Sequence, residues 1–153
     1  SGGFHGHKTD LYDFHDYLDP VTLEIHLEAL ERKDELIMDK VYAPDFAGEA
    51  HLRYPSGTPT CASEYGGMSY SETNTGGWGY RTCSGEEEFV DNYIRLTSRL
   101  LDCEKLSGFC YTQLYDVEQE QNGLLRYDRK FKFSQEAMDR IAGCNLRRAA
   151  IEK

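Results

Sequence analysis

The sequence contains no apolar run close to the roughly 18 residues that a membrane-spanning helix requires. Its first ten residues, SGGFHGHKTD, lack both the basic and the apolar region of a secretion signal. Basic residues are outnumbered, with 17 Lys and Arg against 27 Asp and Glu, and a net charge of -10 repels nucleic acid and anionic lipid. We therefore expect no nucleic-acid partner, no membrane partner and a cytoplasmic protein.

The five cysteines are odd in number and irregularly spaced, which fits neither a disulfide framework nor a zinc knuckle. We expect reduced, mostly buried thiols, as in a reducing compartment. A zinc-dependent hydrolase using His5, His7 and His15 with nearby Asp residues stays open as an alternative, although the spacing matches no standard zinc motif. We expect no metal and no cofactor.

Tryptophan is scarce, with one residue, but 11 Tyr and 7 Phe exceed what a core of this size needs. Some of these rings are therefore expected to line a cleft. A hydrophobic share of 39 % over 153 residues is enough for one globular domain, which we expect to span residues 1–153.

The apolar pattern predicts strands that alternate with helices. The expected strands are 9–17, a strand that ends at 61–64, and 108–115; the expected helices are 20–33, 88–104 and 135–141, the last continuing toward Arg148; residues 41–60 and 65–85 are expected to be loops. This order is typical of a parallel sheet with crossover helices, and polar residues gather at the C-terminal strand ends. Three units are too few to close an eightfold barrel, so either the sheet is open or the chain belongs to something longer.

Glu64 is the sharpest candidate for chemistry. It ends a predicted strand and is followed by Gly66 and Gly67, which allow close backbone approach. A carboxylate in this place can attack an anomeric carbon, whereas a solvated loop glutamate is the alternative on spacing alone.

Three segments together resemble glycoside hydrolase family 2, the family of β-galactosidases, β-mannosidases and β-glucuronidases. SEYGG at 63–67 is similar to its nucleophile motif on the seventh barrel strand, TDLYDFHDYLDP at 9–20 to its sixth strand, and GFCYTQLYDVEQEQNGLLRYDRKFK at 108–132 to its eighth strand and the stretch after it. They occur in the family's order and cover about residues 1–140. The resemblance implies an α/β fold, the C-terminal portion of a (β/α)8 TIM-barrel catalytic domain with about strands six to eight.

The resemblance also implies hydrolysis of β-glycosides with retention, most simply of β-galactosides, through a glycosyl-enzyme on Glu64 with Tyr17 beside it. Retention needs a second carboxyl group, in this family a glutamate that follows an asparagine on the fourth strand. The sequence contains no Asn-Glu pair. We therefore expect the chain to be inactive alone, and its partner to be the missing N-terminal part of the same barrel or, in its place, a second copy.

Four further residues are candidates for contact with a carbohydrate substrate. His15 alternates with Tyr17 and so faces the same side of a strand, although a lone histidine is more often structural. Trp78, flanked by glycines, suits stacking on a pyranose or anchoring of a loop. Gln113 and Asp116 follow the eighth-strand segment and suit hydroxyl recognition.

Two further interpretations concern the substrate. β-Glucuronidases carry an Asn-x-Lys pair after the eighth strand, where this chain has Glu120 to Gly123, and the missing cation argues against a uronic acid. A non-catalytic carbohydrate-binding module built on the same aromatic loop is the alternative from another functional class.

Overall fold

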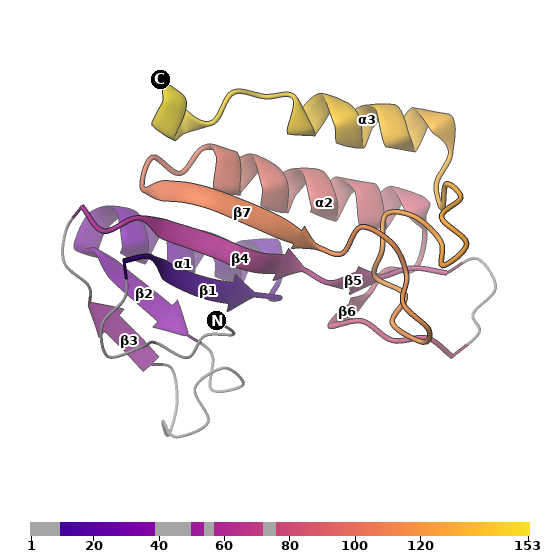
Figure 1. Cartoon of the computed structure of the whole chain (residues 1–153), viewed down its shortest axis with the longest axis horizontal. Helices are drawn as coiled ribbons and strands as arrows, with labels where there is room; N and C mark the ends of the chain where they lie inside the picture. Colours follow the sequence, from indigo (N-terminus) through magenta and orange to yellow (C-terminus); the bar gives the residue numbers. More distant parts are fainter. Residues whose placement is uncertain (1–9, 39–49, 54–56, 72–75) are drawn as a thin grey trace.

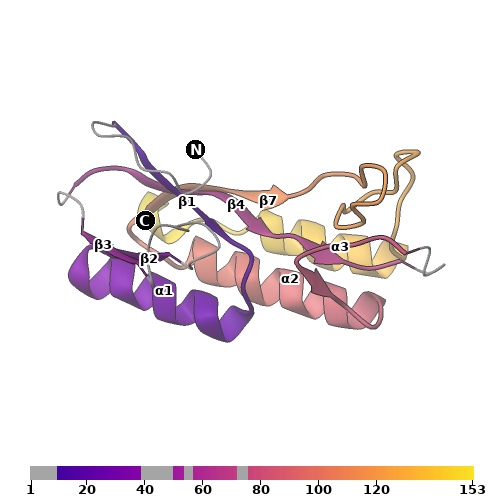
Figure 2. The same ribbon diagram turned by 90° about the horizontal axis from the view of Figure 1, so that it is seen from below.

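The computed structural model describes residues 10–38, 50–53, 57–71 and 76–153. Its main sheet has three parallel strands in the order β1-β4-β7, with β1 at Tyr12–Asp16, β4 at Thr60–Gly66 and β7 at Leu106–Thr112. The helices are α1 at Pro20–Lys33, α2 at Glu86–Leu101 and α3 at Gln135–Asn145, with a 3-10 turn at Ala150–Glu152. All three helices lie on one side of the sheet (Figure 1, Figure 2).

The expectation of a piece of a closed (β/α)8 barrel is wrong for this chain. Within the described residues the parallel sheet is open, because β1 and β7 each pair with β4 alone and form its two edges. Neighbouring strands rotate by roughly 20 to 25° relative to each other, so three of them form a twisted ribbon and not a closed wall. The structure is a small, mostly parallel sheet covered by helices on one face.

Local signals explain why the helices begin where the sequence predicts. The Asp19 side chain accepts hydrogen bonds from the backbone N–H groups of Val21 and Thr22, which caps α1, and Pro20 occupies its first turn. Asp34 ends α1 in the left-handed conformation. The predicted bounds of this helix are confirmed, and the helix predicted at 88–104 is found at Glu86–Leu101.

The core lies between the sheet and the helices. Its largest fully buried members are Tyr65 on β4, Phe89 and Leu100 on α2, and Leu23 and Leu27 on α1. Burial of each such side chain stabilises the fold by about 1.5 to 3 kcal/mol, so the helix-covered face of the sheet is the rigid one. The candidate functional residues at the strand ends are therefore positioned by strands that pack on this buried core.

Two short sheets were not predicted: β3, β5 and β6 lie in the predicted loops 41–60 and 65–85, and β2 lies in a stretch for which the sequence predicts no element. Strand β2, at Glu35–Met38, pairs antiparallel with β3, at Ala50–Arg53. Strand β5, at Met68–Ser69, pairs in parallel with β6, at Arg81–Thr82. Strands of two residues are too short to leave a hydrophobic period in a sequence, which is why the region after Glu64 reads as loop.

All five thiols are free. Three are buried, at Cys83, Cys103 and Cys144, whereas Cys61 is half-buried and Cys110 is exposed. Among the described residues, no helix combines the length and the apolar character that crossing a membrane would require.

Candidate functional site

Glu64 lies at a bulge in β4. From Ala62 onward β4 carries one residue more than either neighbour, because the register shifts between Phe14 and His15 on one side and between Ala62 and Tyr65 on the other. Ala62 and Tyr65 are both buried toward the helices, so the two residues between them share the open face. A bulge re-aims a side chain near the end of a strand, and here it presents the Glu64 carboxylate at the C-terminal edge of the sheet.

Two side chains meet this carboxylate, one from His15 in β1 and one from Tyr17, which directly follows the strand. The Tyr17 hydroxyl donates a hydrogen bond to Glu64 Oε2. His15 Nδ1 lies 3.4 Å from the same oxygen, and its ring meets the Tyr17 ring edge-on at 6.0 Å. Tyr17 and His15 are both shielded from solvent, whereas 43 % of the Glu64 side chain is exposed. The carboxylate is therefore held from one side and open on the other.

Tyr17 stays protonated throughout the neutral range. Burial raises the pKa of its phenol well above the ordinary value, and the hydrogen bond to Glu64 raises it further, while a hydrogen bond with the Thr112 side chain acts in the opposite direction. Thr112 ends β7, so the ends of all three parallel strands meet at this phenol. A protonated phenol donates its hydrogen bond to the Glu64 carboxylate and so fixes one of its oxygens.

A stacked pair of rings fixes the position of Tyr17. Tyr80 lies face to face with it, the ring centroids 3.7 Å apart and the planes within 3° of each other. Gly67 makes this possible: its φ is +57°, and a Cβ there would lie 2.6 Å from Tyr80 Cδ2 and 2.8 Å from Tyr17 Cδ1. Sequence reasoning missed Tyr80, although it lies two residues after Trp78 in the same GGWGY segment.

Trp78 extends the same aromatic group outward. Its ring meets the Tyr80 ring edge-on at 5.7 Å, and 45 % of Trp78 and 47 % of Tyr80 are exposed. Its backbone is fixed on both sides, by hydrogen bonds from Trp78 N to Gln119 O and from Gln121 N to Trp78 O. Trp78 is thus an anchored residue with an exposed ring. We call His15, Tyr17, Glu64, Trp78 and Tyr80 the open corner.

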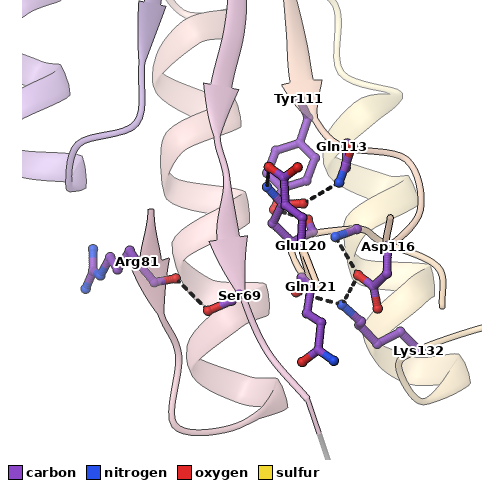
Figure 3. A network of polar contacts seen from close by, with 10 residues as sticks. Ser69, Arg81, Tyr111, Gln113, Asp116, Glu120, Gln121 and Lys132 are labelled. Carbon is purple, nitrogen blue, oxygen red and sulfur yellow. Dashed lines mark hydrogen bonds and ion pairs between the residues drawn. The ribbon is translucent and has the colours of Figure 1, made fainter. Parts of the chain in front are cut away.

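Gln113 and Asp116 belong to a different group of contacts, in the loop after β7. Asp116 is buried and forms an ion pair of 2.6 Å with Lys132, and it also accepts a hydrogen bond from Gly123 N (Figure 3). Gln113 Nε2 donates to Asn122 Oδ1 at 2.7 Å. These polar groups bind one another, and none of these contacts is with the open corner. Their substrate-binding role remains a prediction that their geometry does not support.

Within the described part of the chain, no three His, Cys, Asp or Glu side chains are grouped so that they could hold a metal ion. His5 and His7, on which the zinc alternative depends, lie outside the described residues. The buried pair formed by Asp16 and His26, with 2.6 Å between Oδ2 and Nδ1, instead joins the end of β1 to α1.

The open corner can therefore do one kind of chemistry with the residues at hand. A carboxylate that accepts a hydrogen bond from a phenol and is open to solvent on the other side can act as an oxygen nucleophile. Exposed rings beside it offer flat apolar surfaces to a ligand. No protein-family model matches the chain, and no curated protein sequence matches it.

Proposed function

We propose that this chain carries the nucleophile of a retaining glycosidase of the family-2 type, and that Glu64 is that nucleophile. The observation that carries the proposal is the hydrogen bond from Tyr17 to a Glu64 carboxylate that stays open to solvent. Because β-galactosides are the substrates that the resemblance favours, they are the first to test.

The proposed step is a substitution at a sugar carbon. A Glu64 carboxylate oxygen attacks the anomeric carbon, the bond from that carbon to the leaving-group oxygen breaks, and the leaving group departs with the electron pair. Water later attacks the same carbon and releases the sugar, so the configuration is retained. Tyr17 holds the carboxylate in line, and His15 lies close enough to orient it or to meet a sugar hydroxyl.

Natural leaving groups need a proton as they depart, which a second carboxyl group about 5 to 5.5 Å from the nucleophile supplies in retaining enzymes. We propose that this acid lies in a part of the protein outside these 153 residues. The chain alone is then a poor catalyst for ordinary glycosides but can still form the covalent intermediate with a substrate whose leaving group needs no proton.

A 2,4-dinitrophenyl 2-deoxy-2-fluoro-β-galactoside tests Glu64 on this basis. Dinitrophenolate leaves without protonation, and the fluorine slows hydrolysis of the adduct because it destabilises the oxocarbenium-like transition state. We expect the purified chain to gain one fluorogalactosyl group, which peptide mapping by mass spectrometry places on Glu64.

Two variants make this test specific. Glu64→Gln should take up no label, while Glu120→Gln, which alters a half-buried glutamate of the loop after β7, should label like the unaltered chain. Labelling that persists in Glu64→Gln would sink the nucleophile assignment. Steady turnover of an ordinary aryl β-galactoside by the chain, lost in Glu64→Gln, would instead refute the idea that the acid lies elsewhere.

The exposed rings of Trp78 and Tyr80 favour a second candidate, sugar binding without catalysis. It predicts affinity for a galactoside that survives Glu64→Gln, falls in Trp78→Ala, and is accompanied by no label on Glu64. Titration calorimetry with the two variants separates this candidate from the nucleophile proposal.

A further inference from the structure

The turn between β1 and α1 carries Tyr17, the residue that donates a hydrogen bond to Glu64. Strand β1 ends at Asp16 and α1 begins at Pro20, so residues 17–19 alone join the two elements. Figure 2 shows this short connection between the C-terminal end of β1 and the start of α1. The place of the Tyr17 hydroxyl therefore depends on the conformation of this turn.

The Asp16 side chain bonds to the chain beyond Tyr17 and to the helix. Its Oδ1 accepts a hydrogen bond from Leu18 N at 3.0 Å, and its Oδ2 lies 2.6 Å from His26 Nδ1 on α1. Asp16 is itself part of the parallel sheet, where its register partner is Tyr65 on β4. One carboxylate thus connects the sheet, the turn and the helix.

Both members of the pair formed by Asp16 and His26 are buried, with 4 % and 8 % of their surfaces exposed. A buried carboxylate is tolerated only where hydrogen bonds or opposite charges replace the water that it has lost. His26 and the Leu18 N–H group supply such partners to Asp16. The His26 imidazole therefore helps to keep the carboxylate where it can hold Leu18 N.

The contact that this turn serves depends strongly on geometry. A hydrogen bond weakens steeply when its angle departs from the preferred range, and reactive groups need to be held within about 0.5 Å of their productive places. Tyr17 meets Glu64 through its hydroxyl, at the far end of a long side chain. A small rotation of the backbone at Tyr17 would therefore move the hydroxyl away from the carboxylate.

We propose that Asp16 and His26 are positioning residues for the Glu64 carboxylate and act on it through Tyr17. His26 holds Asp16, Asp16 holds the turn, and the turn places the phenol against Glu64. The inference rests on the proposed function for the reaction that it assists. The position of the phenol, in contrast, can be measured without any substrate.

The variants His26→Leu and His26→Asn test this assignment in the labelling of Glu64 by the fluorogalactoside. Leucine has no group that bonds to Asp16, whereas the asparagine amide offers an N–H group close to the place of imidazole Nδ1. At saturating reagent, labelling should slow by up to about fivefold in His26→Leu, the full effect of losing the Tyr17 hydrogen bond, and should recover in His26→Asn. Asparagine fills less of the core than histidine, so a recovery does not come from better packing.

A double-mutant cycle shows whether His26 acts through the phenol. In a Tyr17→Phe background, His26→Leu should slow labelling no further, because the hydroxyl that it positions is already gone. The paired variant Asp16→Leu/His26→Leu replaces both buried polar groups by apolar side chains, an exchange that often leaves stability unchanged, and it should still slow labelling. Ile141→Val is the opposite control, because it opens a small cavity in the buried face of α3 and should lower the melting temperature without slowing the reaction.

NMR of the chain labelled with carbon-13 at the tyrosine Cζ atoms reads the position of the phenol directly. Tyr17→Phe identifies the Tyr17 signal by its disappearance. This signal should shift in His26→Leu and in Asp16→Leu/His26→Leu, and it should keep its place in His26→Asn and Ile141→Val.

An unchanged labelling rate in His26→Leu and in the paired variant overturns the proposal. A loss that adds to the loss in Tyr17→Phe overturns it as well, because His26 would then act by another route. Absence of label in the unaltered chain removes the nucleophile proposal, and the Tyr17 signal then decides the positioning role by itself. A signal that does not move in either leucine variant overturns that role.

Discussion

Glu64 lies near the C-terminal end of β4 and Asp116 in the loop after β7, yet the surroundings of the two carboxylates are opposite. Asp116 is buried, pairs with Lys132 at 2.6 Å and accepts a hydrogen bond from Gly123 N. Glu64 receives a phenol hydroxyl and lies near a histidine, and 43 % of its side chain stays exposed. Between the two, only Glu64 can reach a molecule that comes from outside.

The difference shows what separates a carboxylate that fixes a loop from one that is accessible to a ligand. A buried acid that pairs with a cation and with a backbone N–H is shielded from other molecules, and it fixes a loop. An acid that accepts a hydrogen bond from a phenol on one side and is exposed on the other stays accessible to a ligand. A carboxylate thus holds the loop after β7 together at Asp116, whereas at Glu64 a carboxylate stays available to a ligand.

The largest expected effect on stability comes from breaking the buried ion pair between Asp116 and Lys132. Lys132→Met leaves the Asp116 carboxylate buried without its cation, and the free energy of unfolding should fall by about 3 to 5 kcal/mol. Urea unfolding measures it. Lys130→Met is the matched control, because the exposed Lys130 pairs only with the exposed Asp128 and should cost nothing measurable. A small loss in Lys132→Met would show that the pair contributes little to holding the loop.

Gly67→Ala disturbs the stacked rings of Tyr17 and Tyr80 beside Glu64. The new Cβ imposes a left-handed residue, at about 1 to 2 kcal/mol, and collides with the stacked rings of Tyr17 and Tyr80, at about 1 to 3 kcal/mol more. Gly57→Ala shares only the first cost, since φ is +84° there and nothing lies within 4 Å. The difference between the two variants in urea unfolding isolates the ring contact, and equal losses would mean that the stack yields freely.

The sequence predicts those parts of the fold that depend on neighbouring residues. The cap at Asp19 and the apolar face of α2 are written in short stretches, so both helices were found at or within a few residues of their predicted bounds. Closure of the sheet is a property of many strands together. The barrel expectation came from the family resemblance and not from these local patterns, and the described residues form an open three-stranded parallel sheet instead.

In the candidate site, too, the contacts that follow from local sequence could be predicted, and those that depend on distant partners could not. Alternation along the predicted strand 9–17 places His15 and Tyr17 on one side, and both meet Glu64 in the structure, although β1 itself ends at Asp16. The bulge in β4 depends on the register of this strand with its two partner strands. The ion pair of Asp116 with Lys132 joins residues 16 positions apart, in a loop whose sequence shows no periodic pattern of apolar residues. Neither the bulge nor this ion pair leaves a local signal, so the sequence alone does not reveal that Asp116 is bonded to Lys132.

The smallest expected effect concerns the single hydrogen bond that distinguishes Glu64 from a solvated glutamate. Tyr17→Phe keeps the ring and its stack on Tyr80 but removes the hydroxyl. A hydrogen bond to a charged group contributes about 1.5 to 3 kcal/mol, and exposure of the carboxylate reduces this to about 1 kcal/mol, so labelling of Glu64 should slow about fivefold. Tyr93→Phe removes a hydroxyl on α2 that bonds to Asn145 Oδ1 and should leave the labelling rate unchanged. Equal rates in Tyr17→Phe and the unaltered chain would mean that the phenol supports only the fold, because a positioning role requires the reaction itself to slow.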